Sequence, residues 1–164
     1  QLWVNLPKAY KMTTPRYQTL LNSDIPTVEL DGGAGQLRVI AGEFRGVAGP
    51  AKTFSPVHLY DLHLTAGHRM ELDLPEGFNS SLFVLHGQVV VNGSQTVDEV
   101  RIGLLGQRGE RVVLEAKQEA TILVLSGQPI AEPIARYGPF VMNTRDEIIQ
   151  AVQDYQAGKM GHLS

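Results

Sequence analysis

Apolar and polar residues alternate in several short segments of the chain. In residues 69–74, apolar Met70, Leu72 and Leu74 alternate with acidic residues. A period of two is typical of a β-strand with one face toward a core and the other toward water. The other segments that this pattern predicts to be strands are residues 36–44, 57–64, 81–91, 99–105, 111–115 and 121–125.

Turn residues separate these segments, and no helical pattern lies between them. Asn92-Gly93 follows the apolar segment 81–91 and is a favoured type I′ hairpin turn. A parallel α/β fold is disfavoured because its crossover helices would have no room. The pattern predicts an all-β fold of the jelly-roll type, and a different antiparallel sandwich topology stays open.

The period changes near the C-terminal end. Thr144 and Glu147 have the spacing of a capping box, and apolar residues then recur at helical spacing up to Tyr155. Gly158 stands where a helix that ends in a left-handed residue places its glycine. These signals predict an α-helix over about 145–157.

The chain thus divides into three predicted parts: an extended N-terminal arm over 1–24, a barrel over 25–128 and a tail with the helix over 129–164. The arm includes a short strand predicted for residues 2–6. Its Trp3 is the only tryptophan of the chain, and we expect it to be a packed anchor.

Composition excludes several functional classes. Basic residues number 14 and acidic residues 17, and they are interspersed without the Lys/Arg clustering that direct nucleic-acid binding needs. No apolar run approaches the ~20 residues that span a bilayer, so we expect no membrane partner. The chain has no cysteine, which excludes disulfides and thiolate metal sites and fits a cytoplasmic protein.

The five histidines do not form a metal-site pattern. His58, His63 and His68 are spaced five residues apart, and an odd spacing turns consecutive side chains of a strand to opposite faces. His86 ends an apolar strand before a glycine, and His162 lies in the tail. No His-x-His segment occurs, so we expect solvated or structurally bonded histidines.

Catalytic motifs are missing as well. The segment Gly32-Gly33-Ala34-Gly35 lacks the Lys-Ser/Thr of a phosphate loop and leads into a predicted strand, so it is interpreted as a turn. Ser126-Gly127 ends a predicted strand with no helix after it and cannot form a nucleophile elbow. We therefore expect no catalytic residue in this chain.

Six segments, taken in order, resemble the C-terminal half of proteins of the pirin family. They are residues 2–7 (LWVNLP), 15–18 (PRYQ), 38–42 (RVIAG), 74–77 (LPEG), 83–93 (FVLHG with VNG) and 137–144 (YGPFVMNT). The resemblance implies a bicupin, in which an N-terminal cupin holds a non-haem iron through three His and one Glu. The C-terminal cupin of that family has usually lost its metal ligands.

The resemblance also indicates what this chain lacks. Alignment on the shared strand ending at Gly87 puts the two histidine positions of the first metal motif near Asp73 and Pro75, neither of which is histidine. Around residues 117–120, near the second motif, no histidine occurs either. The resemblance therefore implies no metal and no cofactor here, with iron in an N-terminal half that we expect to precede Gln1.

The intact parent is then expected to resemble an iron-dependent quercetin 2,3-dioxygenase. A regulatory parent that binds transcription factors or metabolic enzymes stays open. A third hypothesis is a single-barrel protein that binds a small apolar ligand in its cavity.

The partner implied for this chain is the N-terminal cupin. We expect residues 13–21 and 137–155 to help join the two barrels because both add apolar surface outside the strands. When the chain is alone, the exposed patch should favour a homo-oligomer. The candidate interface residues are Trp3, Tyr17, Tyr137, Phe140 and Tyr155.

Overall fold

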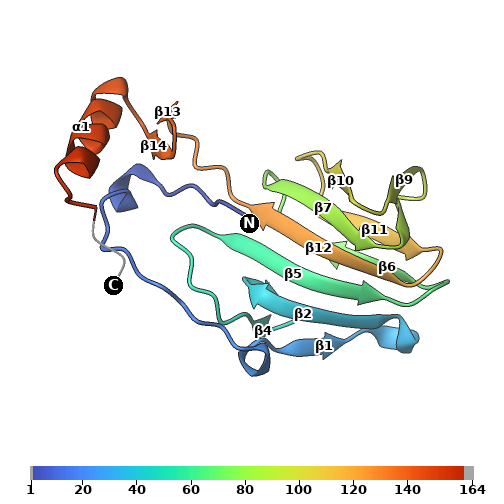
Figure 1. Ribbon diagram of the computed structural model, residues 1–164. Coiled ribbons are helices and arrows are strands. Elements are labelled where there is room, and N and C mark those ends of the chain that lie inside the picture. Colours follow the sequence, from blue (N-terminus) through green and yellow to red (C-terminus); the bar gives the residue numbers. More distant parts are fainter. Residues whose placement is uncertain (1, 161–164) are drawn as a thin grey trace. The chain divides into compact units, whose positions relative to one another are not determined.

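A computed structural model describes residues 2–160 of the chain (Figure 1). Contacts between residues group the described chain into two units. The larger unit covers residues 17–129, and the smaller one combines residues 2–16 with residues 130–160. The predicted division at residues 24 and 128 stays a prediction.

The larger unit contains a six-stranded antiparallel sheet. Its strand order is β1-β2-β5-β12-β7-β10, so strands far apart in the sequence pair with each other. The bounds of its strands are β1 Thr27–Glu29, β2 Gly35–Ala41, β5 Val57–Leu64, β7 Asn79–His86, β10 Arg101–Leu104 and β12 Ala120–Gly127.

A four-stranded antiparallel sheet faces the first one (Figure 1). Its order is β6-β11-β8-β9, and its strands are β6 Arg69–Asp73, β8 Gln88–Val91, β9 Gln95–Asp98 and β11 Arg111–Ala116. A short hairpin of β3 (Glu43–Phe44) and β4 (Val47–Ala48) and the 3-10 turns η2 (Asn22–Asp24) and η3 (Asp31–Gly33) complete the unit. Two antiparallel sheets with this connectivity form the jelly-roll barrel that the sequence predicts.

One apolar core lies between the two sheets. Buried side chains alternate along each long strand, as in β12, whose even-numbered residues are buried and whose odd-numbered ones are half-buried. This is the period of two on which the sequence prediction rests. The fully buried members of the core with the largest side chains are Tyr60, Leu37, Leu62, Leu64, Leu72, Leu82, Leu114 and Ile122.

The apolar segment 81–91, predicted as one strand, is two strands that belong to different sheets. Strand β7 ends at His86 and β8 begins at Gln88. Between them Gly87 has φ +82°, and a Cβ at this position would lie 2.2 Å from the backbone oxygen of Glu119. Only glycine fits this bend, which passes the chain from one sheet to the other.

Other local predictions meet a mixed outcome. The Asn92-Gly93 turn is confirmed, since both residues have positive φ, 51° and 66°. The strand predicted over residues 99–105 is shorter, because β10 covers Arg101–Leu104, and β9 before it was not predicted. Residues 2–6, predicted as a short strand, form no strand.

The smaller unit holds the helix and a second hairpin. The 3-10 turn η1 (Lys8–Tyr10) lies in its first segment, and β13 (Ala135–Tyr137) pairs with β14 (Phe140–Met142) in its second. Helix α1 spans Arg145–Gln156, and its capping box is formed as predicted: Glu147 N–H donates to the Thr144 hydroxyl at 3.2 Å, and Thr144 N–H donates to the Glu147 carboxylate at 2.9 Å. Across residues 2–160, no helix has the length and apolar character needed to cross a membrane.

Candidate functional site

The inward-facing positions in the middle of the barrel are apolar apart from Tyr60. On β6, Met70 and Leu72 face the core, and Leu74 follows directly after the strand; their exposed fractions are 7%, 0% and 6%. The corresponding buried positions on neighbouring strands are Tyr60, Leu62 and Leu64 on β5, Val112, Leu114 and Ala116 on β11, and Ala120, Ile122 and Val124 on β12. Only Tyr60 in this set carries a side-chain nitrogen or oxygen, so the middle of the barrel offers no ligand set for a transition metal.

The two positions aligned with metal ligands lie outside this core. Asp73 alternates with buried Leu72, so its side chain is on the outer face of the sheet, where its Oδ1 accepts a hydrogen bond from Arg111 Nε at 2.9 Å. The Pro75 side chain has no atom that can ligate a metal. In the described part of the chain, no group of three or more His, Asp or Glu side chains is placed to hold a metal ion. The residues present therefore do not fit an iron.

The four described histidines each bond to a different neighbour; the predicted tail residue His162 lies outside the described residues. His63 Nε2 is 3.2 Å from Asp61 Oδ1, and His86 Nδ1 is 2.8 Å from Glu99 Oε2. His68 Nδ1 donates to the backbone oxygen of Ala66 at 3.1 Å. His58 and His63 face opposite sides of β5, as the odd spacing predicts, so no two imidazoles share a site.

His58 and Tyr60 form a hydrogen-bonded pair at one end of the barrel. The Tyr60 hydroxyl donates to the backbone oxygen of Glu43 at 2.6 Å, and it lies 2.6 Å from His58 Nδ1. Because a hydroxyl has one proton, His58 Nδ1–H is then the donor to Tyr60 Oη. Burial lowers the pKa of His58 and raises the pKa of Tyr60 to about 12, so both groups are favoured in their neutral forms.

A row of polar side chains crosses three strands at the same end. Ser126 on β12 is in register with His58 on β5 and with Ser80 on β7. The Ser80 and Ser126 hydroxyls are hydrogen-bonded at 2.8 Å, and Ser126 is only 3% exposed. Sequence reasoning missed this row, because a serine at the end of a strand gives no signal of its partner on another strand. The hydroxyls satisfy each other, and no base contacts either of them in the described hydrogen bonds.

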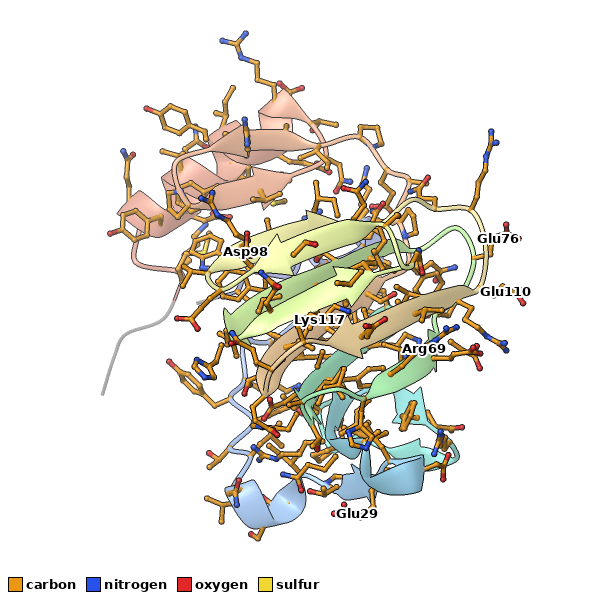
Figure 2. All side chains as sticks on the ribbon, turned by 90° about the vertical axis from the view of Figure 1, so that its right-hand side faces the viewer. Glu29, Arg69, Glu76, Asp98, Glu110 and Lys117 are labelled. Carbon is orange, nitrogen blue, oxygen red and sulfur yellow. The ribbon has the colours of Figure 1, made fainter. Side chains whose placement is uncertain are left out.

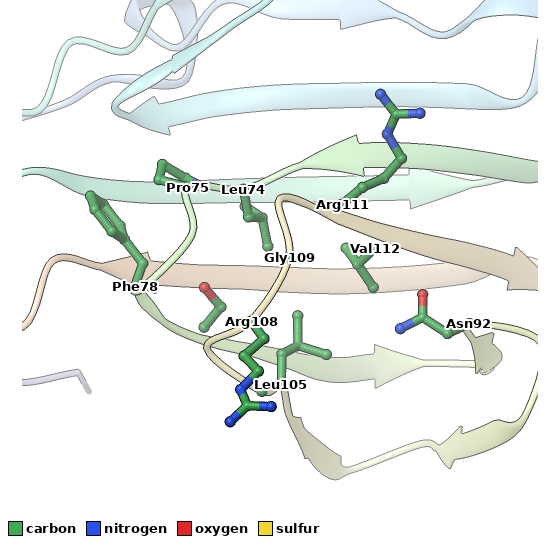
Figure 3. A pocket seen from close by; sticks show the side chains of 11 residues that line it. Leu74, Pro75, Phe78, Asn92, Leu105, Arg108, Gly109, Arg111 and Val112 are labelled. Carbon is green, nitrogen blue, oxygen red and sulfur yellow. The ribbon is translucent and has the colours of Figure 1, made fainter.

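A small pocket opens beside this row (Figure 3). Its volume is ≈ 80 Å³, and its lining includes Phe78, Ser80, Leu105 and Val112. Figure 3 shows the Arg108 and Arg111 side chains pointing in opposite directions, so their guanidinium groups do not converge on one ligand. Pockets for small molecules typically measure about 300–1,000 Å³, and this one is too small for an aromatic ligand with several rings.

A neighbouring depression is wider but shallow. Its volume is ≈ 610 Å³, yet only six residues line it: His58, Asp73, Leu74, Pro75, Glu110 and Arg111. Asp73 and Arg111 are bonded to each other there. The described polar groups at the mouth of the barrel therefore line an open depression.

The candidate interface residues are mostly exposed. Exposed fractions are 66% for Trp3, 94% for Tyr17, 68% for Tyr137 and 65% for Tyr155, while Phe140 is half-buried with its ring centroid 6.0 Å from that of Tyr155. The exposure of Trp3 differs from the packed anchor that the sequence predicts.

The smaller unit has little apolar core of its own. Its buried apolar residues among those described are Ile148 and Ala151. The apolar side chains that it leaves exposed are Leu2, Trp3, Val4, Tyr10, Met12, Ile134, Tyr137, Ile149, Tyr155 and Met160. Such a ratio is unusual for a unit that is stable by itself.

Polar contacts hold the smaller unit together instead. The Glu132 carboxylate accepts from the backbone N–H of Lys8 at 2.7 Å and from Asn143 Nδ2 at 3.0 Å. Glu147 accepts from the N–H groups of Asn143 and Thr144; burial opposes ionisation, but these bonds and Lys8 keep the pKa of Glu147 below its usual value. Asn143 is 8% exposed, and its Oδ1 has no hydrogen-bond partner in the described part of the chain, which leaves one buried acceptor unsatisfied.

The sequence of this chain matches a known protein family. Residues 59–161 match the pirin C-terminal cupin domain. A Pseudomonas aeruginosa protein named "Putative quercetin 2,3-dioxygenase PA2418" is 50% identical over 159 residues, which are 97% of this chain and 55% of that protein. A Solanum lycopersicum "Pirin-like protein" is 39% identical over 164 residues, with 98% of this chain and 56% of the relative covered.

Solved structures agree with these relatives. The crystal structure of a protein named quercetin 2,3-dioxygenase, from Acinetobacter baumannii, superposes with a TM-score of 0.93 at 43% identity, over 99% of this chain and 56% of that one. The chain thus spans about half the length of the proteins it matches.

Proposed function

This chain belongs to the pirin family, whose C-terminal cupin domain it contains, and from that premise we propose that it is the metal-free half of a two-barrel protein. Its role is structural: it packs against an N-terminal cupin barrel and helps to bound that barrel's site. It catalyses no reaction by itself.

The observation that carries this proposal is the apolar lining of the barrel. A cupin that binds iron needs imidazole and carboxylate groups that converge inside the barrel. Here the inward positions of β6 are Met70 and Leu72, and the acidic residue at the strand end, Asp73, is paired with Arg111 on the outer face. A lumen filled in this way supports a packing role and opposes a catalytic one.

The exposed aromatic residues of the smaller unit also support this proposal. It exposes Trp3, Tyr137 and Tyr155 around a minimal core, and aromatic side chains with a polar edge are enriched in protein interfaces. We propose that these residues, with Tyr17 and Phe140, contact the N-terminal barrel. In a chain without that barrel, the same surface would pair with a second copy.

For the intact parent we propose an iron-dependent protein related to quercetin 2,3-dioxygenases, with the iron in its N-terminal barrel. The support is the names that the P. aeruginosa relative and the A. baumannii protein carry. A single-barrel protein that binds a small ligand is not supported, because the pocket beside the row of polar side chains measures only ≈ 80 Å³ and the wider depression at the barrel mouth is shallow.

Metal analysis tests whether the N-terminal half, and not this chain, binds the iron. We compare this chain with a two-barrel fusion, in which the N-terminal part of the P. aeruginosa relative that this chain does not match is joined ahead of residue 1. After anaerobic incubation with Fe(II) and desalting, the fusion should retain about one iron and the chain alone should retain none. Stoichiometric iron in the chain alone, lost on replacement of its own histidines, would overturn the proposal.

Oxygen uptake then distinguishes the two functions considered for the intact parent. Quercetin-dependent uptake by the iron-loaded fusion supports the dioxygenase, whereas iron binding without uptake supports the regulatory alternative. Light scattering of the isolated chain should give a mass above that of a monomer at micromolar concentration. A monomer that binds no hydrophobic dye would count against an interface left open.

A further inference from the structure

The outer face of the six-stranded sheet carries an apolar patch away from the core. In one cross-strand row, Ile102 on β10 is in register with Phe83 on β7, which is in register with Leu123 on β12. In the neighbouring row of the same face, Leu125 on β12 pairs with Leu59 on β5. The members of this outer-sheet patch are Leu59, Phe83, Ile102, Leu104, Leu123 and Leu125.

All six members point away from the buried core positions. Phe83 alternates with buried Leu82 and Val84, and Leu123 lies between buried Ile122 and Val124. The edge of the patch is open, with Ile102 54% and Leu104 79% exposed. The patch is therefore additional to the core that folds the larger unit.

The outer face of the four-stranded sheet is a built-in comparison, because it has the opposite character. On β6 and β11 it presents Arg69, Glu71, Asp73 and Arg111, with Arg111 bonded to both Glu71 and Asp73 at 2.9 Å. Figure 2 shows Arg69 and Lys117 standing on this face. A sheet face that meets water is expected to be polar in this way, so the apolar face of the other sheet marks a surface that a partner covers.

Charged residues border the patch on one side. The row that contains Leu123 continues into Asp61 on β5 and Arg38 on β2. Arg38 Nη1 lies 3.1 Å from Asp61 Oδ2, and His63 Nε2 lies 3.2 Å from the other carboxylate oxygen. An apolar centre beside a polar rim is the usual layout of a specific protein interface.

We propose that the outer-sheet patch is the docking surface for the N-terminal cupin barrel of the same polypeptide. The inference rests on the proposed function and adds which face is covered. The matched domain is the family's C-terminal one, and about 45% of the P. aeruginosa relative lies outside the match, which leaves a domain-sized segment to occupy the face. A partner on the same chain is present at a high effective concentration and outcompetes a second copy.

Thiol reactivity tests this assignment directly, because the chain has no cysteine. We would introduce Leu123→Cys and Ile102→Cys in the patch, and Val113→Cys on the outer face of the charged sheet as a control. Val113 is half-buried and outward-facing like Leu123, which makes it a matched position. Each thiol is labelled with a maleimide in the isolated chain and in the two-barrel fusion, and the labelled peptides of this half are quantified by mass spectrometry.

If the patch is the docking surface, both patch thiols should react at least about 10-fold more slowly in the fusion than in the dilute isolated chain, because labelling then requires the barrels to open. The Val113→Cys thiol should react equally in both proteins. Slow labelling of the fusion that disappears on dilution would mean that a second copy covers the patch, and the proposed occupant would be wrong.

Two other results can be told apart. If small-angle scattering shows a compact fusion in which patch and control thiols react equally fast, the barrels meet through another face; the docking assignment fails and the proposed function stands. If the fusion is extended and its halves unfold independently, the proposed function fails and this inference fails with it.

Discussion

The hydroxyl of Tyr60 bonds to a backbone carbonyl on another segment of the barrel, and its removal is a sharp test of the structure. In Tyr60→Phe the ring stays in place, 1% exposed in the parent and packed with its centroid 5.9 Å from that of Phe44. The variant loses the bond to Glu43 O and the contact with His58 Nδ1, both 2.6 Å long. Each such hydrogen bond contributes about 1 kcal/mol net, and the partners here are half-buried His58 and the backbone of exposed Glu43. We therefore expect the free energy of unfolding to fall by about 2 kcal/mol.

Urea unfolding followed by far-UV circular dichroism measures this change. The midpoint should fall while the m-value is unchanged, because the same surface is exposed on unfolding. For a unit of this size the melting temperature should drop by about 8 °C. Tyr17→Phe is the control, since the Tyr17 side chain is 94% exposed and the substitution should have no effect. A loss below about 0.5 kcal/mol for Tyr60→Phe, within the range of surface substitutions, would refute the hydrogen-bonded arrangement at the barrel end.

Three further changes probe the pH dependence, the bend between the sheets and the helix. Burial lowers the pKa of His58 in the folded chain. The unfolded chain therefore binds more protons below about pH 6.5, and the stability of the fold should decrease on acidification. The His58→Gln variant should show a smaller change of the urea midpoint between about pH 7 and 5. Gly87→Ala should cost at least about 3 kcal/mol, since its Cβ would lie 2.2 Å from a backbone oxygen, whereas Gly93→Ala, with open space around it, should cost about 1 kcal/mol in the same urea assay. Thr144→Ala removes the acceptor of the capping box and should speed amide exchange in α1 by about 5-fold, the equivalent of ~1 kcal/mol, without changing exchange in β12.

Local patterns predicted the elements that depend on neighbouring residues alone. Thr144 and Glu147 are three residues apart and cap each other, and Asn92-Gly93 adopts the positive φ values that its turn requires. The bend at Gly87 was not predicted because apolar residues continue on both sides of it. The change from one sheet to the other depends on strands that are distant in the sequence. The β13–β14 hairpin was missed because its strands have three residues each, too few for a period to be recognised.

Features that depend on cross-strand register were beyond the sequence. The absence of a His-x-His segment could be read directly, but the row of His58, Ser126 and Ser80 joins three strands that are distant in the chain. The outer-sheet patch has the same origin: Phe83 and Leu123 each look like ordinary strand residues until pairing places them side by side. Register decides which apolar residues form a face, and it is fixed by the whole sheet.

The filled lumen and the apolar outer face have a common physical basis. An inward histidine without the other ligands would be a buried polar ring with no partner, which costs free energy. Leucine at such a position, as Leu72 is here, contributes about 1.5–3 kcal/mol by burial and makes the barrel independent of a metal for its stability. Because the inward-facing residues already form the core, the outward-facing residues of β7, β10 and β12 can contact a partner. On the proposed function, a barrel built in this way acts by packing against a partner, and we expect the packing surface to be the apolar outer face of its larger sheet.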